Sequence, residues 1–194
     1  MATPNLDLNA GAPSAVRWFL TGIDRLGRLD GWVGAGCLMA LTCLMLAEVI
    51  ARAASNFFGI GPGVVPNAWE YSSYLMAAAF TFGAAMNLRG GGHIRVTLVT
   101  GNAGPRLKKV LETVSSALAF AATGYLTVSM IVFTWNSYAR GQVSISSGTI
   151  VWPPMALVTI GMGLLALQFL ARAIRASLDL PLEDPSMRAA NPVE

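Results

Sequence analysis

The side chains of this sequence that could do chemistry are few, and its one histidine lies in the densest group of them. His93 follows three glycines in the segment 88–96, which also holds Arg89, Gly92 and Arg95. Successive glycines free the backbone for a close approach. Two interpretations of His93 stay open. It either caps helix ends or meets lipid phosphate within a turn, or it makes a fixed contact with the surface of a partner.

A second group of charged residues surrounds a loop rich in glycine and proline. Glu48 and Arg52 lie four residues apart, which places them on one face of a helix, and Glu70 follows the loop beside Trp69. Trp69 is expected at the membrane boundary, where aromatic side chains gather. Glu48, Arg52 and Glu70 either form ion pairs that tie two helices together, or they contact a partner subunit or a soluble protein.

Residue counts exclude several kinds of catalytic and cofactor site. One histidine cannot supply both axial ligands of a haem, and the shortage of ligands also excludes zinc and iron–sulfur sites. Cys37 and Cys43 are ~9 Å apart along one predicted helix, too far for a disulfide. No glycine-rich loop ends in Gly-Lys-Ser/Thr. We therefore expect a protein that is not an enzyme and holds no metal or cofactor.

The chain that must position these residues has the composition of a membrane protein. Of its 194 residues, 54% are hydrophobic and 12% are charged, against about a quarter charged in soluble domains. The charges gather between long neutral runs, and a helix needs ~20 mostly apolar residues to cross a bilayer. We predict an all-α membrane protein with four transmembrane helices at about residues 29–51, 68–88, 110–138 and 152–171.

The segments around this domain have different patterns. Residues 1–12 are predicted to be disordered, because small and polar residues follow no period there. Residues 13–28 repeat apolar side chains at helical spacing and are predicted to form an amphipathic helix in the membrane interface. The alternative is a continuation of the first span, which two internal glycines disfavour. The four-helix domain then covers 29–175, and a cytoplasmic tail covers 176–194.

The placement of the cations predicts the orientation. Eleven of the 13 Lys and Arg residues lie in the two terminal segments and the middle loop, and only Arg52 and Arg140 lie in the other two loops. Because Lys and Arg resist translocation, both termini are predicted to be cytoplasmic, with Arg172 and Arg175 anchoring the last helix on that side. The net charge of +3 does not indicate nucleic-acid binding, since the cations lie at helix ends.

Three stretches together resemble a known family. Glu48-Val49-x-x-Arg52 closes the first span, Trp69-Glu70 opens the second, and Leu88-Arg89-Gly90-Gly91-Gly92-His93-Ile94-Arg95-Val96 follows it. They resemble the small membrane subunit, the DctQ type, of tripartite ATP-independent periplasmic (TRAP) transporters. The likeness covers most of residues 14–175.

The resemblance implies a multi-pass subunit of the bacterial inner membrane. Its partners would be a large polytopic permease subunit, a periplasmic binding protein and membrane lipid. The large subunit would import an organic acid, such as a C4-dicarboxylate or a similar carboxylate, together with sodium ions, and the small subunit would brace it. The residues that could contact a partner or hold the structure are Glu48, Arg52, Trp69, Glu70, Arg89, Gly92, His93 and Arg95.

Two features of the residues agree with a bracing role. The middles of the four predicted spans carry no charge, whereas a transporter usually buries charge near the bilayer centre. The small-residue pairs Ala79/Gly83 and Ala117/Ala121 allow helices to pack closely. Two other functions remain as alternatives: a membrane-anchor subunit of a redox enzyme complex that lacks its own haem, and a small exporter that works alone.

Overall fold

The computed structural model describes residues 11–90, 104–145 and 147–182. Within these ranges the chain is helical and forms no strand, which confirms the all-α class, and Val143 and Ile150 form one isolated antiparallel bridge. The four helices are α1 (Ser14–Phe58), α2 (Ala68–Arg89), α4 (Pro105–Ala139) and α5 (Trp152–Ser177).

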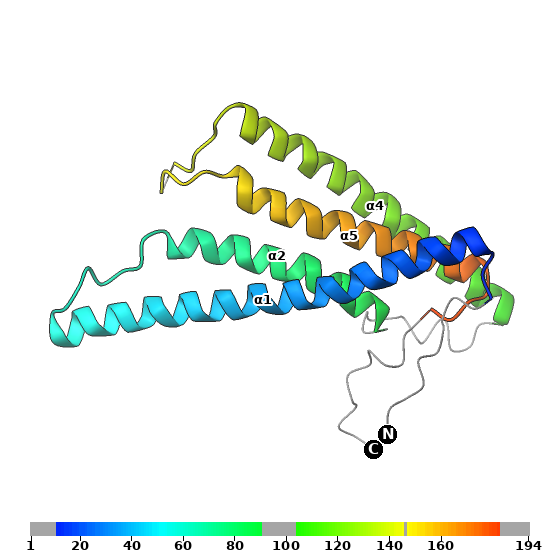
Figure 1. Ribbon diagram of the computed structural model, residues 1–194, viewed down its shortest axis with the longest axis horizontal. Helices are drawn as coiled ribbons and strands as arrows, with labels where there is room; N and C mark the ends of the chain where they lie inside the picture. Colours follow the sequence, from blue (N-terminus) through cyan, green and yellow to red (C-terminus); the bar gives the residue numbers. More distant parts are fainter. Residues whose placement is uncertain (1–10, 91–103, 146, 183–194) are drawn as a thin grey trace, which may run out of the picture.

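The helices form two antiparallel hairpins that lie side by side in the order α4, α5, α2, α1 (Figure 1). The hairpin α1–α2 contacts the hairpin α4–α5 mainly through α2 and α5, and α1 also reaches α5. The helices converge at the end of the molecule where α1 begins and α5 ends, and they spread apart toward the loops 59–67 and 140–151 (Figure 1).

Helix α1 is 45 residues long and continues without a break from the expected interfacial segment into the expected first span. At 1.5 Å per residue it measures ~70 Å, more than twice the ~30 Å hydrocarbon core of a bilayer. Its far end is closed by Gly59, which has a left-handed φ of 66°, and the backbone N–H groups of Gly59 and Ile60 bond back to Ser55 and Ala54.

Three of the described helices are long and apolar enough to cross a membrane, namely α1, α4 and α5. Helix α2 has 22 residues, a sufficient length, but polar side chains such as Ser72, Ser73 and Asn87 dilute its apolar character. A membrane crossing by α2, and so the total of four spans, stays a prediction.

The middle of the molecule is held by apolar side chains and by close contact between helix backbones. Cys37 of α1, Ala79 and Phe82 of α2 and Val158 of α5 are part of one buried cluster. A Cβ added to Gly34 would lie 3.2 Å from the backbone N of Gly83. Helices α1 and α2 thus meet where the small pair Ala79/Gly83 lies, which confirms the close packing expected from that pair.

A second apolar cluster attaches the beginning of α1 to the end of α5. Leu20, Ile23 and Ala171 are buried together, and partly buried neighbours such as Phe19 and Leu167 pack around them. One face of α1 is therefore covered by α5 at this end of the molecule, while side chains on other faces, including Trp18, remain exposed.

Candidate functional site

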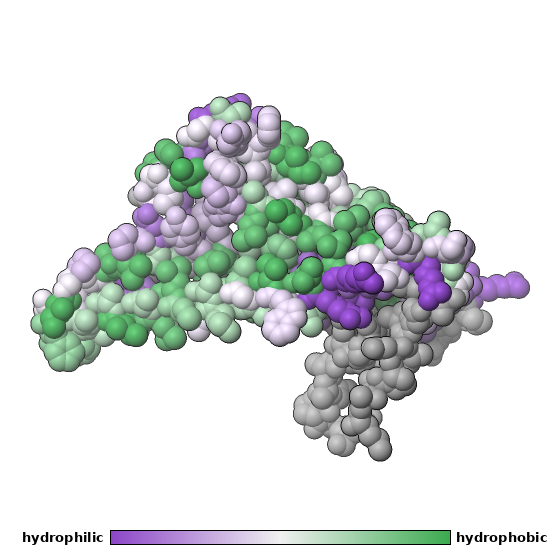
Figure 2. Space-filling model, viewed as in Figure 1, coloured by the Kyte–Doolittle hydropathy of each residue, from purple (hydrophilic) through white to green (hydrophobic). Residues whose placement is uncertain are grey.

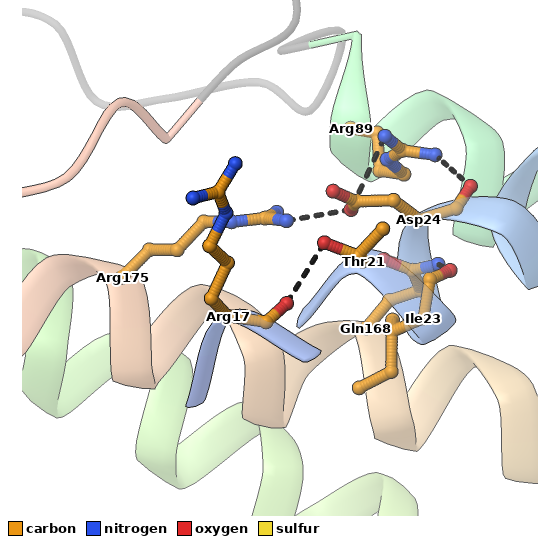
Figure 3. Close-up of polar contacts among 7 residues, drawn as sticks. All are labelled: Arg17, Thr21, Ile23, Asp24, Arg89, Gln168 and Arg175. Carbon is orange, nitrogen blue, oxygen red and sulfur yellow. Dashed lines mark hydrogen bonds and ion pairs between the residues drawn. The ribbon is translucent and has the colours of Figure 1, made fainter. Parts of the chain in front are cut away.

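A group of buried charges ties three helices together at the end where they converge. Nη2 of Arg175 on α5 lies 2.5 Å from Oδ1 of Asp24 on α1, and Nη2 of Arg89 on α2 lies 3.2 Å from the same oxygen. Arg89 also donates through Nη1 to the backbone carbonyl of Asp24, at 2.6 Å. Figure 3 shows both guanidinium groups directed at this one carboxylate.

Arg172 makes a parallel connection to the fourth helix. Its Nη2 lies 3.2 Å from Oε2 of Glu112 on α4, and its Nη1 donates to the carbonyl oxygen of Leu88 on α2 at 3.3 Å. Arg172 thereby joins α5 to both α4 and the end of α2. Below, the ion-pair cluster means the five charged residues of these contacts: Asp24, Arg89, Glu112, Arg172 and Arg175.

A glycine lets the cluster approach the backbone of α1. A Cβ added to Gly27 would lie 2.5 Å from Nε2 of Gln168 and 3.0 Å from Cδ of Arg89. Nε2 of Gln168, on α5, donates to the carbonyl oxygen of Ile23 at 3.1 Å. Because Gly27 has no side chain, an amide and a guanidinium reach main-chain oxygens of α1, as Figure 3 shows for Gln168 and Arg89.

The ion-pair cluster is almost free of solvent, and a further buried carboxyl group, that of Asp30, lies on the same helix as Asp24. The side chains of Arg89 and Arg175 are 3% and 5% exposed. Asp30, one turn and a half beyond Asp24, is also buried, and its Oδ2 has no hydrogen-bond partner among the described residues. Buried charges are stable only when they are paired, because transferring each ion out of water costs several kcal/mol.

The opposite end of the molecule contains a shallower polar site. Oε1 of Glu48 accepts bonds from Nε and Nη2 of Arg52 at 2.9 and 2.8 Å, within α1. The other oxygen of Glu48 accepts from the backbone N–H of Val65 at 2.6 Å. Glu48 is buried, whereas half of the Arg52 side chain is exposed. The buried carboxylate therefore fastens the loop 59–67 onto α1, and the arginine covers it from the solvent side.

Glu70 of α2 is bound by a residue of the hairpin α4–α5. It accepts a short hydrogen bond from the hydroxyl of Ser147, in the loop between α4 and α5, and a longer one of 3.5 Å from the hydroxyl of Tyr74. A groove of about 540 Å³ runs between these two anchor points. We call it the loop-end groove, and its lining includes Glu48, Arg52, Trp69, Glu70 and Ser147.

The structure therefore gathers some of the sequence-predicted residues and separates others. Glu48, Arg52, Trp69 and Glu70 meet around the loop-end groove, although Arg52 pairs with Glu48 and not with Glu70. Arg89 lies at the other end of the molecule, in the ion-pair cluster. The remaining candidates, Gly92, His93 and Arg95, lie outside the described residues.

Sequence reasoning missed most of the ion-pair cluster. It placed Arg172 and Arg175 as anchors at the membrane surface, but their side chains are only 9% and 5% exposed and bond to other helices. One signal was available for Asp24, because it stands among Leu20, Ile23 and Gly27 on the face that the apolar spacing predicts to be buried. A carboxylate at a buried position needs a partner. The sequence does not say which cation supplies it.

Comparison with known proteins adds the family. Residues 41–178 match the model of a family described as "Tripartite ATP-independent periplasmic transporters, DctQ component". The chain belongs to the DctQ family. The match confirms the resemblance seen in the sequence and covers well over half of the chain. Neither the curated proteins nor the solved structures that were compared show a match.

Membership of the DctQ family makes this chain a component of a transporter and not of an enzyme family. The three arginines of the cluster and Glu112 lie inside the matched segment, but Asp24 precedes it. The loop-end groove lies within the match entirely. In this DctQ chain, then, the N-terminal part of α1 supplies the carboxylate of Asp24, which pairs with Arg89 and Arg175 of the family segment.

Proposed function

We propose that this protein is the small membrane subunit of a TRAP transporter and that it braces the large permease subunit. The large subunit imports an organic acid, a C4-dicarboxylate or a similar carboxylate, with sodium ions, and a periplasmic binding protein delivers that acid. The family match over residues 41–178 carries this proposal. A large permease and a binding protein are partners that the family implies in general.

The distribution of charge within the described residues supports a static role. Most of the buried charges lie at the end where the helices converge, and Glu48, which is also buried, lies with Arg52 and Glu70 at the loop-end groove. Between them, the core consists of apolar side chains and a few hydroxyls, such as the pair Thr134 and Thr159 at 3.1 Å. A sodium or carboxylate site at mid-depth needs ionisable groups or broken helices. The ion-pair cluster serves instead to fix the helices to one another.

Helix α4 is the part of the brace that we propose to meet the large subunit. In the most apolar 18-residue stretch of α4, no residue is buried within this chain. In the corresponding stretch of α5, 39% of the residues are buried. The small residues Ala117 and Ala121 lie exposed on it. Small side chains allow another helix to approach closely in a membrane, where van der Waals packing drives association. The exposed face of α4 therefore suits a long helix of the partner.

The orientation follows the sequence prediction. We propose four spans in the inner membrane with both termini in the cytoplasm, so that the ion-pair cluster lies on the cytoplasmic side and the loop-end groove on the periplasmic side. We propose that residues 13–28, which include the first turns of α1, lie at the cytoplasmic interface and continue as one helix into the first span. Their exposed arginines and tryptophan have the composition of an interfacial segment.

Uptake measurements test the bracing role. The two-subunit complex is reconstituted in liposomes with the binding protein, and uptake is measured against substrate and sodium concentrations for His93→Ala and Arg95→Ala. A brace predicts a change in complex abundance or in maximal rate, with both apparent affinities unchanged. A tenfold change in either affinity at constant abundance, ~1.4 kcal/mol at the transport site, would place this subunit in the transport path and contradict the proposal.

The same preparation separates the two alternatives. A membrane anchor of a redox enzyme predicts flavin, haem or quinone absorbance in the purified complex. An exporter that works alone predicts transport by this chain without a second subunit. The family match favours neither of them.

A further inference from the structure

The exposed side of α1 near its beginning has a groove that the packing of the four helices does not explain. The groove has a volume of about 510 Å³, and its lining includes Trp18, Phe19, Gly22, Arg25 and Leu26 of α1. Leu167 of α5 closes one side of it. Its walls are therefore apolar, apart from one guanidinium and one hydroxyl.

The groove exists because of a glycine. Trp18, Gly22 and Leu26 follow each other at intervals of four residues and so form one row along the helix surface. A Cβ added to Gly22 would meet nothing within 4 Å. The missing side chain leaves a notch between two large ones, and the exposed fraction of Trp18, 82%, shows that the indole stands out from the helix.

Cations lie next to this apolar notch. Arg25 lines the groove, is exposed, and forms no ion pair within the described ranges. A second groove of about 480 Å³ begins on the other side of Trp18, where Ser14 and Arg17 line it. Figure 2 shows strongly hydrophilic atoms at this end of the molecule, next to hydrophobic atoms along the helices.

We propose that the groove binds one phospholipid with an anionic headgroup, with the phosphate on Arg25 and an acyl chain along the apolar wall that Gly22, Leu26 and Leu167 form. A linear hydrocarbon chain fits a narrow apolar notch, and a guanidinium binds a phosphate through two parallel hydrogen bonds. Trp18 lies at the level where indole rings bridge acyl chains and headgroups. The inference rests on the orientation proposed above, which places this part of α1 in the cytoplasmic leaflet, where anionic lipids attract basic segments.

The occupant is a lipid because the groove adjoins the bilayer itself. Helix α1 is one of the helices apolar enough to span the membrane, and the groove lies at the cytoplasmic end of its proposed span, where lipid meets the faces of the helix that protein leaves uncovered. The cation at the notch then selects among lipids by headgroup charge. The experiment below distinguishes a bound lipid from a protein segment that occupies the groove.

Lipid binding to the purified two-subunit complex tests the proposal. Native mass spectrometry counts the lipids retained after addition of phosphatidylglycerol or phosphatidylcholine to wild type and variants. Gly22→Leu fills the notch and Arg25→Gln removes the cation, and both are expected to weaken phosphatidylglycerol binding at least tenfold. The matched controls are Gly36→Leu, another glycine of α1 with open space around it, and Arg28→Gln, an exposed arginine outside the groove lining. Both controls should bind as wild type does.

Three results would overturn the lipid site. Equal retention of phosphatidylcholine would show that no anionic headgroup is recognised. Equal losses in Arg25→Gln and Arg28→Gln would show a diffuse attraction of the basic helix for anionic lipid. Loss of the large subunit from Gly22→Leu alone, with lipid retention unchanged, would show a protein segment in the groove. Because the readout is lipid binding, a negative result leaves the uptake test of the bracing role unaffected.

Discussion

Arg175 and Asp24 lie 151 residues apart in the chain, yet their side chains form an ion pair of 2.5 Å inside the protein. The pair joins the last turn of α5 to α1 at a point one turn beyond the buried Leu20. Because Arg89 binds the same carboxylate, one aspartate fixes the relative positions of three helices. The N-terminal part of α1 is thus a structural member of the bundle.

Neutralising this aspartate is expected to destabilise the protein strongly. Asp24→Asn leaves Arg89 and Arg175 buried without their shared counter-ion, a loss on the order of 3–5 kcal/mol. Thermal melting of the complex in detergent measures the effect. Asp179→Asn is the matched control, because Asp179 pairs with Lys109 at 2.5 Å but its side chain is 70% exposed, and surface pairs contribute little. Equal melting of the two variants would contradict a bracing role for the cluster.

Gly27 is expected to tolerate no side chain. In Gly27→Ala the new methyl group would displace Gln168 from the carbonyl of Ile23 and press on Arg89, at a cost of about 1–3 kcal/mol. Gly22→Ala, five residues earlier in the same helix, meets open space and should raise stability by up to about 1 kcal/mol through helix propensity. Melting temperatures that move in opposite directions are the expected result, and a fall in both would mean that the helix backbone itself needs flexible residues.

At the loop-end groove, the two members of the Glu48–Arg52 pair should differ in effect. Arg52→Ala removes a half-exposed cation and should cost on the order of 1 kcal/mol or less. Glu48→Ala should cost more, because it also leaves the N–H of Val65 without its acceptor. Melting of the complex measures both. Normal melting with lost uptake in Arg52→Ala would assign this arginine to contact with the binding protein, whereas parallel losses would assign it to structure.

The face of α4 that meets the large subunit can be tested by adding bulk to it. Ala121→Leu places a large side chain on the exposed face of α4 and should reduce the amount of large subunit that co-purifies by severalfold, since close helix packing needs small residues there. Ala40→Leu adds the same bulk to an exposed position of α1 and should leave co-purification unchanged. The reverse pattern would place the partner against α1.

Reporter fusions test the orientation. A periplasmic reporter should be active at Gly61 and Gly141, in the two loops with few cations, and inactive at Gly91, which follows α2 in the cation-rich connection. The result at Gly91 also decides whether α2 crosses the membrane, because α2 alone separates it from Gly61. Periplasmic activity at Gly91 would contradict both the four spans and the cytoplasmic placement of the ion-pair cluster.

The sequence by itself determined the helical class, the family and much of each helix. The lengths of the neutral runs predicted the helices, and the expected helix at 68–88 corresponds to α2 at Ala68–Arg89. These features follow from local properties, because the length of an apolar run and the conformational freedom of a glycine do not depend on distant residues. The break expected near residue 28 did not occur, since Gly27 packs against Gln168 and Arg89 and the tertiary contacts outweigh its low helix propensity.

The tertiary structure alone decided which charges pair between different helices. Asp24 meets Arg89 and Arg175 across 65 and 151 residues, and Glu48 takes the N–H of Val65 while Glu70 takes the hydroxyl of Ser147. Each helix can present a charged side chain in any direction around its axis, and only the packed bundle fixes that rotation. Burial then imposes the pairing, because an ion removed from water is stable only beside a counter-ion or a hydrogen-bond partner.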